Sequence, residues 1–306
     1  MELNFSRDKT AAPRAGAAPL PASTVILMRD GRESPFEVLL MRRHHQQSFM
    51  SGAYVFPGGR VDDDDRRPDP SFVVGRTDDQ VWESFRDPNL DHESALGYYL
   101  AAVRETFEEA GVLLADRRNS DNRPLSSDRL ASYRAGLHDG RVSLEKIAVE
   151  AGVQIRLDWL LPYSHWITPE AERKRFDTRF FLARLPEGQE TRHDEVEMSD
   201  SLWVTPREAI NGFNAGRIIL VPPTLVTLEE LAEMASIEQA IALAGKRRVY
   251  PILPQAFMDG SIVSLKLPHD PEYSIEAFRQ PPRPDEISRL KLVDGRWQTV
   301  KVDRKE

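Results

Sequence analysis

The eight residues from Arg104 to Gly111, Arg-Glu-Thr-Phe-Glu-Glu-Ala-Gly, constrain the fold of this chain more than any other segment. Its three acidic residues stand at i, i+3 and i+4, so on a helix their carboxylates share one face: Glu105, Glu108 and Glu109. Like charges at this spacing repel by roughly 0.2–0.5 kcal/mol per pair. Gly111 is typical of a helix C-terminus, where the helix dipole favours cations. The segment therefore predicts a helix end that a divalent cation with oxygen ligands would stabilise.

The residues before this segment extend the prediction to one amphipathic helix over residues 92–110. At about 100° per residue, four apolar side chains fall opposite Glu105: Leu96, Leu100, Val103 and Phe107. Asp91 or Asn89 provides the N-cap. The alternative is an ordinary helix with an acidic polar face, in which Arg104 and Glu108 form an i, i+4 ion pair.

A tight turn upstream favours the metal-binding interpretation. Phe56-Pro57-Gly58-Gly59 follows a β-rich stretch, and two adjacent glycines let the backbone approach a ligand or metal closely. Together with residues 104–111, this turn resembles the Nudix box, G-x5-E-x7-R-E-U-x-E-E-x-G-U. The second half of the box matches at every fixed position except the apolar position U, which is Thr106.

The resemblance implies an α+β fold, an α/β/α sandwich with a mixed sheet in which the box forms a loop–helix–loop. It also implies Mg²⁺ or Mn²⁺ as cofactor and hydrolysis of a nucleoside diphosphate linked to another moiety. The implied metal ligands are the Gly58 carbonyl and the carboxylates of Glu105, Glu108 and Glu109. These glutamates and Arg104 form the predicted catalytic set, in which Arg104 orients the glutamates by hydrogen bonding.

The chain departs from the box by an insertion. Arg104 follows Gly59 by 104 − 59 = 45 positions, whereas the pattern has 14, so 31 residues are inserted. Counted back from Arg104, the early Glu of the box falls at Leu96, which is not acidic. An insertion here resembles the peroxisomal-type coenzyme A diphosphatase branch of the family and its bacterial relatives.

A second motif points to the same branch. Leu39-Leu40-x-x-Arg43, Gly52 and Phe56–Gly59 follow the spacing of its coenzyme A signature, L-L-T-x-R-[SA]-x3-R-x3-G-x3-F-P-G-G. Coenzyme A or acyl-coenzyme A is the implied substrate, with 4′-phosphopantetheine and adenosine 3′,5′-bisphosphate as products. Two alternatives stay open. Three altered signature positions (Met41, His44 and Ser48) allow a dinucleotide or nucleotide sugar such as NADH or ADP-ribose, and the missing early Glu allows a non-catalytic nucleotide-binding module.

Further residues are candidates for substrate binding or acid–base chemistry. Arg43 and Gly59 belong to the coenzyme A spacing, while Arg175 and Phe176 suit a phosphate contact and adenine stacking, with a basic loop as the alternative. Glu195 or Glu197 is a candidate further acid, with a surface loop as the alternative. The run Asp62–Asp65 is interpreted as flexible surface, because four consecutive acids cannot all face one ion in an extended loop. Only Asp62 is close enough to Gly59 to matter.

Composition limits the partners. A net charge of −8 excludes general binding to nucleic acid or anionic membranes, and the absence of cysteine excludes disulfides and thiolate metal sites. No apolar run approaches the roughly 18 residues of a membrane span, and residues 1–20 contain no signal-peptide core. We therefore expect a cytoplasmic protein that binds a small-molecule nucleotide, with a homodimer allowed.

The pattern predicts three regions: a flexible arm over 1–20, a Nudix domain over 21–250 and a C-terminal extension over 251–306. Insertions are expected at about 60–91, with a helix near 80–85, and at about 116–152, with helices over 127–137 and 143–151. Residues 23–29 and 35–43 predict a hairpin, and 153–160 and 178–184 predict strands. A strand at 202–204 leads into a helix capped by Thr205, and helices near 224–234 and 236–245 precede strands around 261–267 and 290–301.

Overall fold

The computed structural model describes residues 18–31, 34–44, 51–66, 69–117, 125–192, 198–283 and 285–302. Its centre is an eight-stranded sheet with the order β10-β2-β1-β9-β8-β11, in which β3 pairs with β2 and β4 pairs with β1. The sheet is mixed, because β1 is parallel to β9 but antiparallel to β2 and β4. Its strands are β1 (Leu20–Asp30), β2 (Phe36–Arg43), β3 (Tyr54–Val55), β4 (Gly58–Arg60), β8 (Leu161–Ile167), β9 (Phe176–Arg184), β10 (Met198–Val204) and β11 (Pro251–Ile252).

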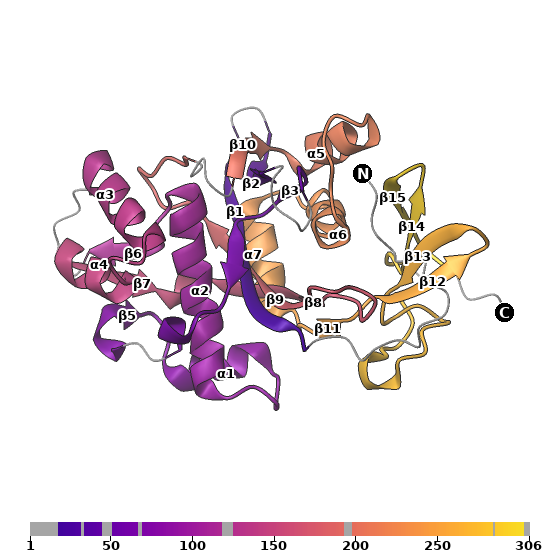
Figure 1. Ribbon diagram of the computed structural model, residues 1–306, viewed down its shortest axis with the longest axis horizontal. Helices are drawn as coiled ribbons and strands as arrows, with labels where there is room; N and C mark the ends of the chain where they lie inside the picture. The colour runs from indigo at the N-terminus through magenta and orange to yellow at the C-terminus, as the bar shows by residue number, and fades with distance from the viewer. Residues whose placement is uncertain are drawn as a thin grey trace.

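Helices cover both faces of this sheet (Figure 1). One face carries α2 (His92–Ala110), and the other carries α5 (Pro206–Asn214), α6 (Pro222–Leu231) and α7 (Ile237–Lys246). Alternate residues of β1 serve the two sides: Val25 and Leu27 pack in the core with α2, whereas Ile26 and Met28 pack with α5–α7. A strand segment buried on both faces is continuously apolar, as β1 is from Val25 to Met28. The predicted α+β sandwich is confirmed.

Helix α2 has the predicted bounds and the predicted buried face. The Asp91 side chain accepts a hydrogen bond of 2.7 Å from the Ser94 backbone N–H, which caps the N-terminus. Gly111 ends the helix in the left-handed conformation with φ of 73°. The four apolar side chains opposite Glu105 are all buried: Leu96, Leu100, Val103 and Phe107. This packing fixes which face of α2 is left for the carboxylates.

The two insertions lie together beside α2 and share a small sheet (Figure 1). The first contains a 3₁₀ turn (Pro70–Phe72), β5 (Val73–Val74) and α1 (Asp78–Phe85). The second region contains β6 (Ala115–Arg117), α3 (Ser127–His138), α4 (Leu144–Ala151) and β7 (Val153–Arg156). The strand order β5-β7-β6 joins them, with Val73 opposite Ile155. The predicted helices are confirmed, but the sequence did not reveal that the insertions pair with each other.

The chain after β11 forms an antiparallel sheet of four strands: β12 (Gln255–Asp259), β13 (Ile262–Lys266), β14 (Arg289–Val293) and β15 (Arg296–Val300). Strand β12 was not predicted.

The expected strand at 153–160 ends at Arg156 and is followed by a 3₁₀ turn (Leu157–Trp159). The next strand, β8, was not predicted and enters the central sheet. The predicted divisions at residues 20 and 250 remain predictions. Across the ranges that the structure describes, no helix is both long and apolar enough to cross a membrane.

A buried polar cluster ties the central sheet to the first insertion. His165 Nε2 lies 2.6 Å from Asp177 Oδ1, and Arg179 Nη2 donates to Asp87 Oδ2 at 2.6 Å, just beyond α1. Burial lowers the pKa of His165 below its ordinary value, although the hydrogen bond with Asp177 opposes this shift. Burial alone would raise the pKa of Asp177, but its hydrogen bond with His165 and the nearby charges outweigh burial and lower it.

We expect acid to weaken this cluster in two pH ranges. As pH falls below the ordinary His value of 6.5, the unfolded chain binds a proton that native His165 does not, so the free energy of unfolding falls. The contribution of Asp177 is present above 3.8 and is lost at lower pH, as pH falls through its lowered pKa. Urea midpoints between about pH 7.5 and 5.5 should therefore shift less for His165→Gln than for the wild type. Buried His269, whose pKa is also lowered, contributes the same pH dependence to the wild type and to His165→Gln. Equal shifts of the urea midpoint in the two proteins would therefore contradict the role assigned to His165.

Candidate functional site

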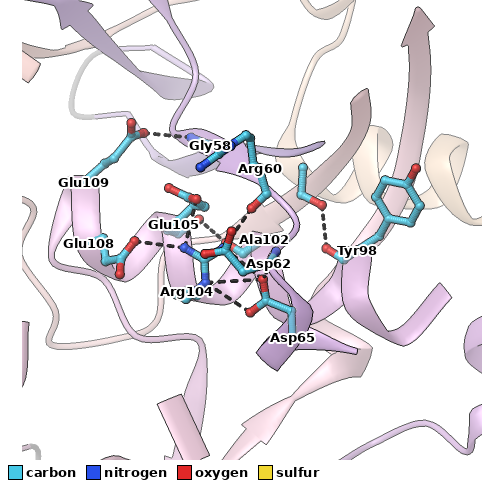
Figure 2. A network of polar contacts seen from close by, with 12 residues as sticks. Gly58, Arg60, Asp62, Asp65, Tyr98, Ala102, Arg104, Glu105, Glu108 and Glu109 are labelled. Carbon is cyan, nitrogen blue, oxygen red and sulfur yellow. Dashed lines mark hydrogen bonds and ion pairs between the residues drawn. The ribbon is translucent and has the colours of Figure 1, made fainter. Parts of the chain in front are cut away.

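Arg104 is the centre of a network of carboxylates on the face of α2 that carries Glu105 and Glu108 (Figure 2). Its Nη1 donates to Glu105 Oε1 at 2.9 Å and to Glu108 Oε2 at 3.0 Å, as the sequence predicted. Its Nε and Nη2 donate to the two carboxylate oxygens of Asp65, at 3.0 and 2.9 Å, and Nη2 also donates to the Arg60 carbonyl at 2.8 Å. One planar guanidinium thereby fixes three carboxylates at once.

The Pro-Gly-Gly turn meets the same face of the helix. The Gly58 N–H donates to Glu109 Oε2 at 2.7 Å, and Glu109 is only 2% exposed. A Cβ at Gly58 would lie 2.2 Å from the Ser23 carbonyl oxygen of β1. A Cβ at Gly59 would lie 2.3 Å from Glu105 Oε1. Gly58 is therefore required by its close contact with the sheet backbone, whereas a side chain at Gly59 would displace the Glu105 carboxylate.

The structure corrects the prediction for Asp65. Asp65 is 4% exposed and lies in a 3₁₀ turn (Asp63–Asp65), so it is not flexible surface. It follows Gly59 by six positions, which is the G-x5-E spacing, and it therefore occupies the place of the early acid. The predicted place at Leu96 is wrong, because Leu96 packs in the core. The 31-residue insertion lies between Asp65 and Arg104, which are 104 − 65 = 39 positions apart against 8 in the pattern. The G-x5-E spacing counted forward from Gly59 identifies Asp65 from the sequence.

Negative charge exceeds positive charge within this network. Arg104 faces Asp65, Glu105 and Glu108, and Asp62 lies 3.5 Å from its Nη2, while Glu109 adds a fifth carboxylate beside Gly58. Burial raises the pKa of Glu108 above its ordinary value, and the charge and hydrogen bond of Arg104 oppose that shift. An additional cation would relieve the repulsion among these acids.

The donor set fits Mg²⁺ or Mn²⁺. Carboxylate and carbonyl oxygens are the hard ligands that these ions prefer. Among the described residues, no three His, Cys, Asp or Glu side chains converge as they would around an ion. Arg104 and the Gly58 N–H instead hold the glutamates. Coordination of an ion by the three glutamates therefore requires their carboxylates to move closer together.

The other candidate residues lie outside this network. Arg43 is half-buried at the end of β2, and its N–H donates to the Ala53 carbonyl at 3.0 Å on the strand segment that leads to Gly58. Phe176 pairs with Leu20 of β1, whereas Gly58 pairs with Thr24, so the two positions are roughly 13 Å apart along that strand. Arg175 precedes Phe176, and its Nε donates to the Thr168 carbonyl at 3.0 Å. Glu195, Glu197 and Ser48 lie outside the described residues, and a role for any of these residues in binding remains a prediction.

Comparisons with known proteins identify the family of the chain. The family described as the NUDT19 Nudix domain matches residues 10–231. The chain is 30% identical over 289 residues to the human (Homo sapiens) acyl-coenzyme A diphosphatase NUDT19, covering 83% of this chain and 74% of that protein. It is 27% identical over 286 residues to the Xenopus laevis protein of the same name, covering 79% of this chain and 74% of that protein. The crystal structure of a NUDIX hydrolase from Alicyclobacillus acidocaldarius superposes with a TM-score of 0.56 at 27% identity, covering 74% of this chain and 96% of that one.

Proposed function

This chain belongs to the Nudix family, in the group described by the NUDT19 Nudix domain, and we propose that it is a metal-dependent diphosphatase of coenzyme A or acyl-coenzyme A. The observation that carries the proposal is the carboxylate network around Arg104 beside the Pro-Gly-Gly turn. Asp65 supplies the acid whose apparent absence had favoured a non-catalytic module, so that alternative loses its basis.

Two observations support coenzyme A as the substrate class. Relatives that align over most of the chain are named acyl-coenzyme A diphosphatase. The spacing of Leu39-Leu40, Arg43, Gly52 and Phe56–Gly59 also follows the coenzyme A signature. Hydrolysis of the diphosphate of coenzyme A would give 4′-phosphopantetheine and adenosine 3′,5′-bisphosphate.

In this proposal the metal ligands are Glu105, Glu108 and Glu109 with the Gly58 carbonyl. When bound, Mg²⁺ or Mn²⁺ neutralises diphosphate charge and lowers the pKa of a coordinated water. The residues of the chain hold these ligands in position. Arg104 holds Glu105 and Glu108, Asp65 holds Arg104, and the Gly58 N–H holds Glu109. Phosphoryl transfer depends mainly on such positioning and charge neutralisation.

A dinucleotide or nucleotide sugar remains the second candidate, because Met41, His44 and Ser48 depart from the coenzyme A signature. The test is a comparison of kcat/KM for coenzyme A, an acyl-coenzyme A, NADH and ADP-ribose with Mg²⁺ or Mn²⁺, with products resolved by chromatography. We expect the highest value for coenzyme A or its acyl form. A higher value for NADH or ADP-ribose would overturn the substrate assignment, and no turnover of any compound would overturn the enzyme assignment.

Gly59→Ala should lower kcat by roughly 100-fold, because displacement of a catalytic group by about 1 Å has effects of that size. The added methyl would occupy the space of the Glu105 carboxylate, which must then move. Steady-state kinetics measure the change. Gly245→Ala on α7 is the matched control, since its Cβ would meet no atom within 4 Å. Wild-type kcat in Gly59→Ala would remove Glu105 from the proposed site.

A further inference from the structure

The C-terminal end of α2 is completed by a side chain from the second insertion. An α-helix leaves its last four carbonyls without partners of its own. In α2 the Gly111 N–H donates to the Phe107 carbonyl at 3.0 Å, and the Arg192 N–H donates to the Ala110 carbonyl at 2.9 Å. The other two carbonyls, those of Glu108 and Glu109, accept hydrogen bonds from Arg134 Nε at 2.7 Å and Nη2 at 2.5 Å.

Arg134 brings a positive charge to a helix end that has no basic residue of its own. The last turn of α2 contains no basic residue and carries two of the glutamates, although a helix C-terminus favours cations. Arg134 comes from α3 and brings a positive charge to this end. The rigid guanidinium of Arg134 suits two adjacent carbonyl acceptors. Gly111 leaves room for this guanidinium, since a Cβ at Gly111 would lie 3.4 Å from Arg134 Nη1.

We propose that Arg134 is a positioning residue for the carboxylates of Glu108 and Glu109. It contacts the backbone carbonyls of these residues, whereas Arg104 contacts the side chain of Glu108. The two arginines thereby fix the same helix turn, Arg134 through its backbone and Arg104 through a side chain. The second insertion acquires a function in this way, because it presents α3 to the catalytic helix. The inference rests on the proposed function of the carboxylate network.

Arg134→Met should reduce both Mn²⁺ affinity and kcat by roughly 10- to 100-fold, the effect typical of residues that hold metal ligands from outside. KM for coenzyme A should change less than twofold, because the role assigned to Arg134 is to hold the Glu108 and Glu109 carbonyls. Arg134→Lys should recover part of both losses, since a lysine restores the charge but not the two-pronged contact. Recovery by lysine would separate positioning from a packing defect.

Arg129→Met is the matched control on the same helix. Arg129 donates to the Tyr133 hydroxyl and the Glu150 carbonyl, so its loss perturbs α3 without touching α2. Electron paramagnetic resonance of free Mn²⁺ measures metal affinity without substrate, steady-state kinetics give kcat and KM, and circular dichroism verifies folding. If Arg134→Met does not fold, Arg134→Gln, which keeps N–H donors without the charge, takes its place.

Weaker Mn²⁺ binding and lower kcat in the Arg134 variant, with wild-type values in Arg129→Met, would support the inference. Wild-type Mn²⁺ affinity in the folded Arg134 variant, or an equal loss in Arg129→Met, would overturn it. A wild-type protein that binds Mn²⁺ but hydrolyses no diphosphate would overturn the proposed function alone, because the Mn²⁺ comparison still tests Arg134. A wild-type protein that binds no Mn²⁺ would overturn both.

Discussion

Glu108→Gln should lower kcat by roughly 1,000-fold or more, which corresponds to a loss of about 4 kcal/mol of transition-state stabilisation. The substitution keeps the shape of the side chain and removes a negative charge that is assigned to the metal. Folding should survive, because Arg104 keeps its contacts with Asp65 and Glu105. Steady-state hydrolysis of coenzyme A at saturating Mg²⁺ measures the loss, and circular dichroism verifies the fold.

The control for this variant is Glu93→Gln, which removes an exposed carboxylate from the first turn of the same helix. It should keep the wild-type rate, because Glu93 lies at the opposite end of α2. A rate of Glu108→Gln within tenfold of the wild type would show that Glu108 is not a principal metal ligand. Equal losses in both variants would point to a general effect of helix charge.

Arg104→Met should lower the free energy of unfolding by about 3–5 kcal/mol, the usual effect of breaking a buried ion pair on one side. The Arg104 side chain is 11% exposed, and the side chain of its partner Asp65 is 5% exposed. Burial alone would lower the pKa of Arg104, but the hydrogen bond with Asp65 and the carboxylate charges raise it overall. Without Arg104, Asp65 would be a buried carboxylate that has lost its cation. Urea unfolding near neutral pH measures the change.

Two control variants are compared with Arg104→Met. Arg141→Met breaks an exposed pair with Asp139, whose side chains are 67% and 54% exposed, and should change stability by less than about 1 kcal/mol. Asp65→Asn should be milder than Arg104→Met, because Arg104 retains Glu105 and Glu108. A loss below about 1 kcal/mol for Arg104→Met would contradict a stabilising role for the network.

Features set by neighbouring residues could be predicted from the sequence. The bounds of α2 follow from Asp91, from the apolar period and from Gly111, all within or next to the helix. The predicted cap of α5 is also present, since the Thr205 hydroxyl accepts from the Glu208 N–H at 3.1 Å. Thr106, at the apolar position of the box, is accommodated locally, because its buried hydroxyl donates to the Ala102 carbonyl at 2.7 Å.

Features that depend on distant residues could not be predicted in the same way. The contact of Asp65 with Arg104 spans 39 positions, and the acidic run around it favoured a surface loop. Arg134 contacts residues about 25 positions earlier, and nothing in its local pattern distinguishes it from the other arginines of the insertion. Strand β8, with Pro162 and a polar Ser164-His165 pair, lacks a strong apolar pattern and is recognised only by its neighbours in the sheet.

The most direct test of the account is the metal dependence of product formation from coenzyme A. The purified wild-type protein should convert coenzyme A into equal amounts of 4′-phosphopantetheine and adenosine 3′,5′-bisphosphate in the presence of Mg²⁺ or Mn²⁺. Excess chelator should stop the reaction, and added metal should restore it. Hydrolysis that the chelator does not affect, or no cleavage of coenzyme A with either metal, would contradict the proposal of a metal-dependent coenzyme A diphosphatase.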